Sequence, residues 1–156
     1  MGVRLTEEEI DDFLTKGHTL IVASIRKTGE PFMVPLWYVW QDGAFWYSTI
    51  ATSPKIGHIK RDKRVCCMVE EGKRWVDLHC VVANCDAEII TDEALIERFR
   101  AANELKYGPY RLDPALMPGA TNTHYAQNRA IVKATPRPGE IRTWYNRKIK
   151  FKGPVD

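Results

Sequence analysis

Residues 48–64 read Ser-Thr-Ile-Ala-Thr-Ser-Pro-Lys-Ile-Gly-His-Ile-Lys-Arg-Asp-Lys-Arg, and they predict a β-strand that passes directly into a helix. Ser53 is a good N-cap, and Pro54 suits the first helical position because its φ is already helical. Lys55 then lies at the positive end of the helix dipole, where a cation is unfavourable unless an anion is shared with the free N–H groups. The stretch predicts a site for a phosphate or carboxylate, although a plain helix start with a solvated lysine fits the same residues.

Three antiparallel strands are predicted before this junction, at residues 18–25, 31–41 and 44–50, because these runs are rich in β-branched and aromatic residues. Glycine-containing turns separate them, of which Asp-Gly is the strongest hairpin signal. Ahead of the strands, residues 6–9 form a capping box of Thr and Glu, which predicts a short amphipathic helix closed by Gly17.

Four further strands are predicted beyond the junction, the second with a bulge near Asn84: residues 64–70, 75–90, 129–135 and 140–145. We expect the last two to form a pair joined by a turn at Pro136-Arg-Pro-Gly139. Thr91 is expected to cap a helix, residues 107–123 read as a loop because they hold three prolines and two glycines, and residues 146–156 form a basic tail.

This order of elements predicts a mainly β protein with a few helices, a small antiparallel barrel in one domain over residues 1–156. The chain has 156 residues and a net charge of +3, which by itself requires neither nucleic acid nor a membrane as partner. No apolar run is long enough to span a bilayer, so a cytoplasmic location is the default expectation.

The cysteines and histidines do not form a recognisable metal or catalytic pattern. The four cysteines, Cys66, Cys67, Cys80 and Cys85, lack the spacing of a zinc site and read as buried thiols, so no metal is predicted. The histidines are scattered singly, and His79 is the best candidate if the protein binds haem. No spacing indicates a Ser-His-Asp or Cys-His set, so any redox chemistry is expected to come from a cofactor.

An ordered series of short motifs resembles the flavin-binding split-barrel family, whose best-known member is pyridoxamine 5′-phosphate oxidase. The resemblance covers residues 18–90 well and the final strands loosely. It implies a split, Greek-key-like β-barrel that forms a homodimer, with flavin mononucleotide (FMN) at the dimer interface. The motifs that carry it are Gly29-Glu-Pro31, Val34-Pro-Leu-Trp-Tyr38, Ser53-Pro-Lys55, Ile59-Lys-Arg-Asp62 and Arg64-Val65.

Roles for particular residues follow from this resemblance. It places Ser53 and Lys55 on the FMN phosphate, and Ser48 and Thr49 near the ribityl chain and ring. The residues implied beside the isoalloxazine ring are Pro35, Leu36 and Trp37. Those implied to come from the second subunit are Trp144 and Arg147, with Arg142 and the Trp75-Val-Asp77 segment as further candidates.

The implied function is a flavin-dependent oxidoreductase acting on a small, planar or conjugated molecule. The C-terminal segment with which the oxidase recognises pyridoxal phosphate is not recognisable here, so vitamin B6 synthesis is not predicted. Two alternatives stay open. The deazaflavin coenzyme F-420 would use Lys60, Arg61 and Lys63 for its longer tail, and a flavin- or haem-binding carrier or sensor would need no catalysis. The basic tail with interleaved aromatic residues also fits single-stranded nucleic acid, but the small net charge favours packing on a partner chain.

Overall fold

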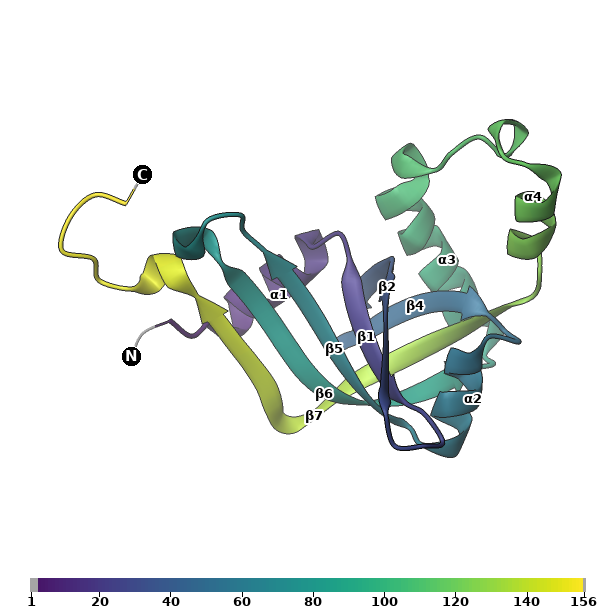
Figure 1. Cartoon of the computed structure of the whole chain (residues 1–156), viewed down its shortest axis with the longest axis horizontal. Helices are drawn as coiled ribbons and strands as arrows, with labels where there is room; N and C mark the ends of the chain where they lie inside the picture. Colours follow the sequence, from purple (N-terminus) through teal and green to yellow (C-terminus); the bar gives the residue numbers. More distant parts are fainter. Residues whose placement is uncertain (1–2, 156) are drawn as a thin grey trace.

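The computed structural model describes residues 3–155, and over this range the protein is mainly β, with seven strands in one antiparallel sheet ordered β2-β1-β5-β6-β7-β4-β3 (Figure 1). The strands are β1 (Leu20–Ile25), β2 (Pro31–Leu36), β3 (Tyr38–Gln41), β4 (Ala44–Ile50), β5 (Arg64–Glu71), β6 (His79–Ile90) and β7 (Arg129–Tyr145). The helices are α1 (Glu7–Lys16), α2 (Pro54–Arg61), α3 (Glu93–Tyr107) and α4 (Gly119–Tyr125), with 3₁₀ turns η1 (Trp75–Asp77), η2 (Gly108–Tyr110), η3 (Pro114–Leu116) and η4 (Asn146–Lys148).

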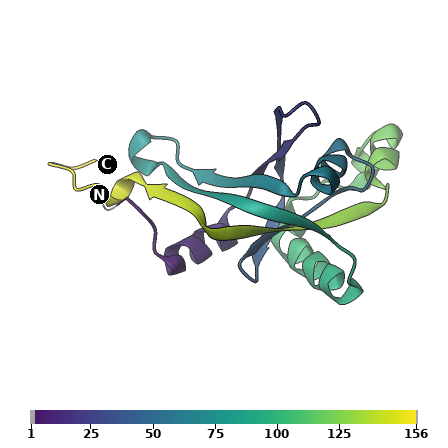
Figure 2. The same ribbon diagram turned by 90° about the horizontal axis from the view of Figure 1, so that it is seen from below.

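The sheet is curled into a half-barrel, as expected for a split barrel. Strands β2 and β3 follow one another in the chain but lie at opposite edges of the sheet, and Trp37 is the one residue between them. The predicted strand at residues 31–41 is therefore two strands. Figure 2 shows β5, β6 and β7 running the length of the molecule, with α1 and α3 on one side of them and α2 on the other.

Two apolar clusters hold the helices to the sheet. Phe13 and Leu14 of α1 and Ile56 and Ile59 of α2 belong to the main core with the inward side chains of the strands. Phe99 of α3 packs in a second cluster against β3, β4 and β7. Ile10, Phe13 and Leu14 share one face of α1 because they lie three and four residues apart. The predicted capping box at the start of α1 is confirmed, with both the Thr6 and the Glu9 bonds in place.

The expected pair of final strands is wrong: residues 129–145 are one continuous strand, β7. Its two halves both pair with β6, from Tyr145 opposite His79 and from Ile131 opposite Ile90, so the chain bends at Pro136–Gly139 instead of reversing. The bend lies opposite Asn84, where residues 137–140 of β7 face this single residue of β6. The predicted irregularity is therefore found near Asn84, but the bulged strand is β7, because β6 pairs with β5 through Asn84 without a break.

Smaller corrections concern helix starts and loops. Helix α3 is capped by Asp92, whose carboxylate accepts from the Leu95 N–H at 3.0 Å, and not by Thr91. Residues 75–77 are a 3₁₀ turn and not strand, and the expected loop at 107–123 contains η2, η3 and most of α4. Three of the cysteines are buried and Cys66 is half-buried, all as free thiols. No helix among residues 3–155 is long and apolar enough to cross a membrane.

One phenol fixes the crossover between the sheet edges. The buried Tyr107 oxygen accepts from the Tyr38 N–H at 3.0 Å, and its proton faces the carbonyls of His18 at 2.7 Å and of Tyr38 at 2.9 Å. The Tyr107 ring stacks on Trp37 with 4.6 Å between centroids and 7° between planes. Desolvation raises the pKa of Tyr107 to about 12, so the phenol stays a donor at neutral pH. The C-terminal end of α3 is thereby joined to the β2–β3 crossover.

Lys106 lies beside this contact in an unusual state. Its ammonium nitrogen is 4.2 Å from the Tyr38 ring centroid and 5.3 Å from that of Tyr107. The nitrogen is buried and has no hydrogen-bond partner among the described residues. Desolvation lowers the pKa of Lys106 to about 8. Contact with two aromatic faces thus replaces the water that a lysine normally keeps.

We expect Tyr107→Phe to lower the free energy of unfolding by about 1–3 kcal/mol, because it leaves the buried Tyr38 amide without its acceptor. Urea denaturation followed by tryptophan fluorescence measures the change. Tyr110→Phe is the matched control, since Tyr110 is 64% exposed and should change stability by less than about 0.5 kcal/mol. Equal effects of the two substitutions would contradict the role given to the Tyr107 hydroxyl.

Lys106→Met should alter how stability depends on pH. The native protein binds the Lys106 proton less tightly than the unfolded chain does, so charging this lysine costs folding free energy below about pH 8. The cost disappears as the pH rises from about 8 toward the ordinary lysine value of 10.5. The free energy of unfolding of the variant minus that of the parent should therefore be larger near pH 7 than near pH 10. Urea denaturation of both proteins at each pH measures this difference. Lys60→Met, which removes an exposed lysine, is the control. A stability difference for Lys106→Met that does not change with pH would refute this.

Candidate functional site

The predicted strand–helix junction is confirmed, with Ser53 at the N-cap of α2 and Pro54 in its first turn. The expected capping bond is not made: the Ser53 hydroxyl accepts from no first-turn N–H and lies 3.3 Å from the Thr49 hydroxyl instead. The first turn of α2 therefore has no side-chain acceptor of its own. An anion at this helix end would find unsatisfied donors and a favourable dipole.

Lys55 is half-buried in the first turn of α2, with no carboxylate partner among the described residues. Desolvation lowers its pKa, and the positive charge of Arg129 lowers it further. A cation that is partly desolvated and faces a second cation is a net cost to the fold. An anion bound between Lys55 and Arg129 would remove that cost, so the arrangement fits an anionic ligand.

Arg129 is the residue of this site that the sequence analysis missed. It begins β7 opposite Ile50, the last residue of β4. Its Nε donates to the Ser48 hydroxyl at 2.9 Å and an Nη donates to the Ser48 carbonyl at 3.1 Å. Ser48 thus orients one cation of the group Ser53, Lys55 and Arg129, which we call the anion cradle. The sequence analysis placed Arg129 at the start of a predicted strand, residues 129–135. No local pattern in the sequence indicates that this strand pairs with β4.

The second part of the site is an aromatic cluster around the crossover. Trp37 has Tyr107 stacked on it, the His18 ring edge-on at 6.2 Å, and the Arg111 guanidinium 5.9 Å from its ring centroid. Pro35 is exposed and Leu36 half-buried at the end of β2, directly before Trp37. The predicted ring-side residues are therefore together at the sheet edge.

The two residues predicted to come from a second subunit lie away from the cradle. Trp144 is near the C-terminal end of β7, opposite Cys80, and is 39% exposed. Arg147 in η4 forms an ion pair with Asp77 at 2.6 Å. Figure 1 shows this end of β7 and η4 at the opposite end of the sheet from α2. One chain does not bring Trp144 and Arg147 to Lys55, and their role in the site stays a prediction.

The outer face of the sheet is largely apolar on β2, β1 and β5, and on β6 it presents Val82 and the polar Asn84. Its side chains fall in two rows of cross-strand neighbours, and Met33 among them is 58% exposed. Trp144 lies on the same face of β7 as Arg142, which neighbours Val82. The rows are Pro35–Ile21–Met68–Val82 and Met33–Ala23–Cys66–Asn84.

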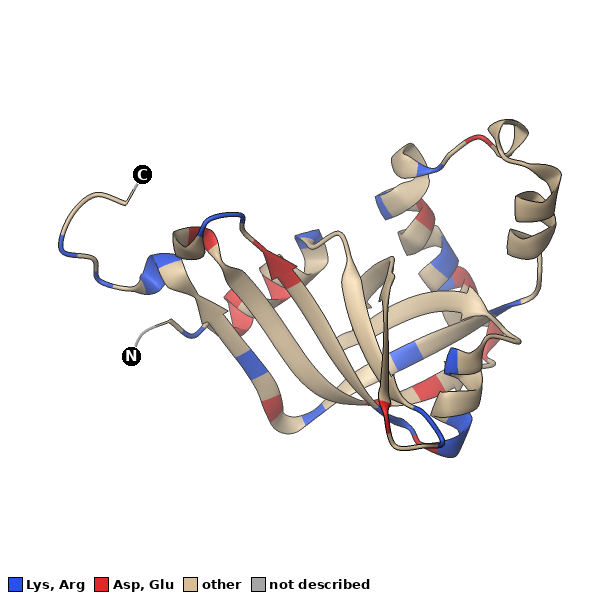
Figure 3. Ribbon diagram, in the orientation of Figure 1, with Lys and Arg blue, Asp and Glu red and all other residues tan. Residues whose placement is uncertain are grey.

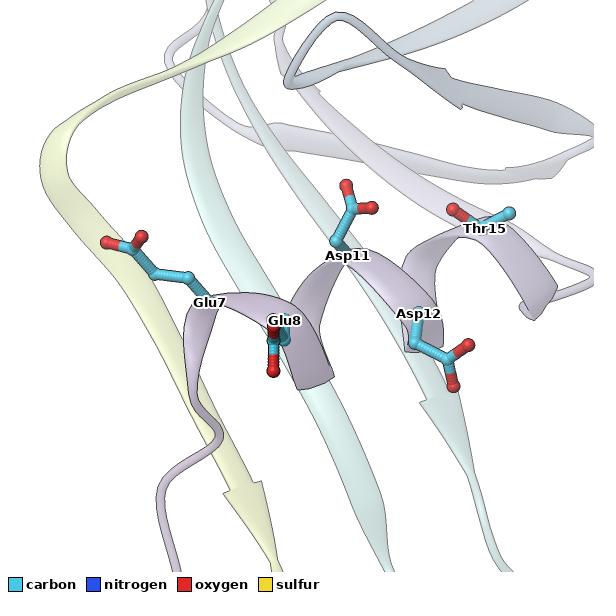
Figure 4. A pocket seen from close by; sticks show the side chains of 5 residues that line it. All are labelled: Glu7, Glu8, Asp11, Asp12 and Thr15. Carbon is cyan, nitrogen blue, oxygen red and sulfur yellow. The ribbon is translucent and has the colours of Figure 1, made fainter.

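The hollows elsewhere on the surface have the wrong charge for a phosphate. One lies along α1, where Figure 4 shows the outward side chains of Glu7, Glu8, Asp11, Asp12 and Thr15. A neighbouring groove joins Glu7 and Asp11 to Trp40 and to the β7 bend. Figure 3 shows carboxylates along α1, whereas lysines and arginines gather at α2 and in the C-terminal segment. The α2 junction is therefore the better anion site.

His79, the candidate for a haem ligand, is enclosed. Its ring lies between Tyr145, stacked at 4.3 Å, and Phe13 at 3.8 Å. Its Nε2 is buried without a hydrogen-bond partner among the described residues, and desolvation lowers the pKa of the imidazole. Both ring faces are packed and Nε2 is buried, whereas the residue as a whole is half-buried, so the haem role of His79 stays a prediction.

Comparison with known proteins gives the same family as the motifs. The sequence model described as pyridoxamine 5′-phosphate oxidase matches residues 6–144. The chain finds no significant match among curated protein sequences.

Solved structures share the fold at low sequence identity. A conserved hypothetical protein, Rv2991 from Mycobacterium tuberculosis, is similar with a TM-score of 0.78 and 24% identity over 99% of this chain and 94% of its own. A FAD-binding protein from Mesorhizobium loti has a TM-score of 0.67 and 21% identity over 92% and 97% of the two chains. An F-420 reductase has a TM-score of 0.62 and 16% identity over 85% and 94%.

Proposed function

The chain belongs to the pyridoxamine 5′-phosphate oxidase family, and from this we propose that it is a flavin-dependent oxidoreductase that binds FMN with Ser53, Lys55 and Arg129 at the phosphate. One observation carries the proposal. Lys55 is partly desolvated and repelled by the charge of Arg129, and neither cation has an ion-pair partner among residues 3–155. Lys55 lies in the first turn of a helix whose N-cap side chain makes no capping bond. A phosphate monoester supplies the missing charge and the missing acceptors.

The other residues would position the ring. Ser48 and Thr49 lie near the end of β4, just before Ser53 and α2, and Ser48 keeps Arg129 in place through two hydrogen bonds. Pro35, Leu36 and Trp37 would border the isoalloxazine, with Trp37 held in orientation by its stack on Tyr107. The flavin, when bound, accepts and returns a hydride, and the substrate is a small organic molecule. The chain's own part is to bind, orient and exclude water.

The same proposal includes a homodimer formed through the apolar outer face. In a single chain no other element packs over the rows that contain Met33 and Met68, among residues 3–155. In a two-fold dimer these rows of one copy would pack against the same rows of the other. Because Trp144 lies on that face at the far end of the sheet, the second copy would bring its own Trp144, and Arg147 beyond it, toward the cradle. This is how residues that one chain keeps apart would form one pocket.

The F-420 alternative rests on Lys60. Of the three cations assigned to a longer tail, Arg61 donates to the Ile25 carbonyl and Lys63 forms an ion pair with Asp86 at 3.0 Å. Lys60 is exposed on α2 without an ion-pair or hydrogen-bond partner among the described residues. Lys60→Met should weaken F-420 binding and leave FMN binding unchanged, which separates the two cofactors.

The absorbance spectrum of the purified protein, followed by titrations with FMN and with F-420, tests the proposal directly. Flavin bands or saturable FMN binding would support it. Binding of F-420 alone would replace the cofactor and keep the cradle. Failure to bind either would overturn the proposed function.

Phosphate recognition should depend on Lys55 and Arg129. The parent should bind FMN more tightly than riboflavin, which lacks the phosphate, as measured by quenching of flavin fluorescence. Lys55→Met and Arg129→Met should each raise the Kd for FMN about 10- to 100-fold, through loss of a charge-assisted contact, and leave the Kd for riboflavin unchanged. The control Lys16→Met also removes one positive charge but lies on α1 and should change neither Kd. If FMN affinity fell equally in the control, a general charge effect would replace the cradle.

A shared pocket predicts complementation between two defective chains. Lys55→Met and Trp144→Ala homodimers should both bind FMN weakly. Refolded as an equimolar mixture, they form heterodimers with one intact pocket, so about one site in four should regain parental affinity. Separate refolding of each variant is the control. No recovery in the mixture, with dimers shown by sedimentation, would mean that each pocket lies within one chain.

A further inference from the structure

The segment that connects the two parts of the site is residues 108–128, which we call the strap. It begins directly after Tyr107, which stacks on Trp37, and it ends directly before Arg129, which belongs to the anion cradle. Figure 1 shows α3 and α4 projecting together from one end of the sheet. The strap therefore runs from Trp37, proposed to border the flavin ring, to Arg129, proposed to bind the phosphate. The proposed function gives no role to the residues between them.

The strap presents one cation to the aromatic cluster. Arg111 lies with its guanidinium 5.9 Å from the Trp37 ring centroid. The positive charge of Arg111 also acts on Arg129. The pKa of Arg129 is lowered mainly by desolvation; Tyr125 raises it, and the charge of Arg111 lowers it further. Arg111 thus lies over the ring of Trp37, and its charge acts on Arg129.

The partners of Arg111 are weak enough to be exchanged. Its Nε donates to the Glu104 carboxylate at 3.0 Å and an Nη donates to the Asn103 side-chain oxygen at 3.1 Å. The side chains of the ion pair are 47% and 65% exposed, and exposed pairs of this kind contribute little to stability. A ligand carboxylate could therefore take the place of Glu104 at little cost, and the planar guanidinium would hold it through two parallel hydrogen bonds.

Flat rings line the approach to this guanidinium. Tyr110, next to Arg111, is 64% exposed and meets His18 edge-on at 4.8 Å. His18 in turn lies edge-on to Tyr107 at 5.3 Å. Aromatic edges and faces recognise a flat conjugated molecule, whereas the guanidinium recognises its charge.

From this geometry we infer that Arg111 binds the carboxylate of the substrate, and that the substrate class is a planar, conjugated carboxylic acid bound between Trp37, Tyr110 and the flavin. The inference rests on the proposed function and adds to it the charge and shape of the substrate. Arg111 is a binding residue here, carried on the strap and held ready by Glu104 until the ligand arrives.

Calorimetric titration of the FMN-loaded protein with trans-cinnamate and with its neutral amide tests the inference. The parent should bind cinnamate at least about tenfold more tightly than cinnamamide. Arg111→Met should weaken cinnamate about 10- to 100-fold and leave cinnamamide unchanged, because it removes only the charge-assisted contact. The matched control is Arg100→Met. Arg100 lies on α3 and is also paired with a glutamate, Glu97, so this variant should bind both probes as the parent does.

Glu104→Gln distinguishes a ligand contact from a structural ion pair. If the Glu104 carboxylate competes with the substrate, its removal should strengthen cinnamate binding, by up to about fivefold. If the Arg111–Glu104 pair only holds the strap in shape, both Glu104→Gln and Arg111→Met should weaken cinnamate binding, and that result would overturn the inference. Equal affinity of the parent for the acid and the amide would overturn it as well.

Two further results separate this inference from the proposed function. If Arg111→Met weakened FMN but not riboflavin, Arg111 would be a phosphate residue and the inference would fail while the proposed function stood. If the protein bound no FMN, the proposed function would fail. The same titrations on the cofactor-free chain would then decide the Arg111 contact: acid-selective binding that Arg111→Met removes supports it, and its absence overturns it.

Discussion

The structure depends on how the chain crosses from one edge of the sheet to the other at a single residue. Between β2 and β3 the backbone leaves one ladder of hydrogen bonds and joins another, and buried amide groups at such a break need other partners. The Tyr107 phenol supplies them for Tyr38 and at the same time faces the His18 carbonyl. Because its ring also stacks on Trp37, one side chain fixes the crossover, the end of α3 and the aromatic wall of the site.

The anion cradle has the opposite character, since it is held at a cost. Lys55 is partly desolvated and repelled by the charge of Arg129. Neither has an ion-pair partner among residues 3–155, whereas eleven ion pairs form between other residues there. Ser48, which would be free to solvate a ligand, instead keeps Arg129 in this position. Groups that lower stability and yet are oriented by specific bonds are typical of binding sites, because the ligand offsets the cost.

The sequence predicts this site where its residues are neighbours in the chain. Ser48, Thr49, Ser53 and Lys55 come together because a strand runs straight into a helix, and capping and turn chemistry are local. Pairing between distant strands is not local. Residues 129–145 look like a hairpin because Pro136 and Gly139 are turn residues, and only the common partner β6 makes them one bent strand. Arg129 was missed for the same reason, because its place beside Ser48 follows from the β4–β7 pairing.

The strap shows why the substrate could not be read from the barrel motifs. Its two ends are fixed by the parts of the molecule on which the fold and the cradle depend, Tyr107 and Arg129, whereas between them Leu112, Leu116 and Tyr125 are more than half exposed. A segment anchored at both ends and loosely packed between them can change its side chains without disturbing the sheet. Changes at Arg111 or Tyr110 would then alter the ligand presented to an unchanged flavin site. In the proposed function this separation divides the work: the barrel would hold the cofactor, and the strap would select the molecule that reaches it.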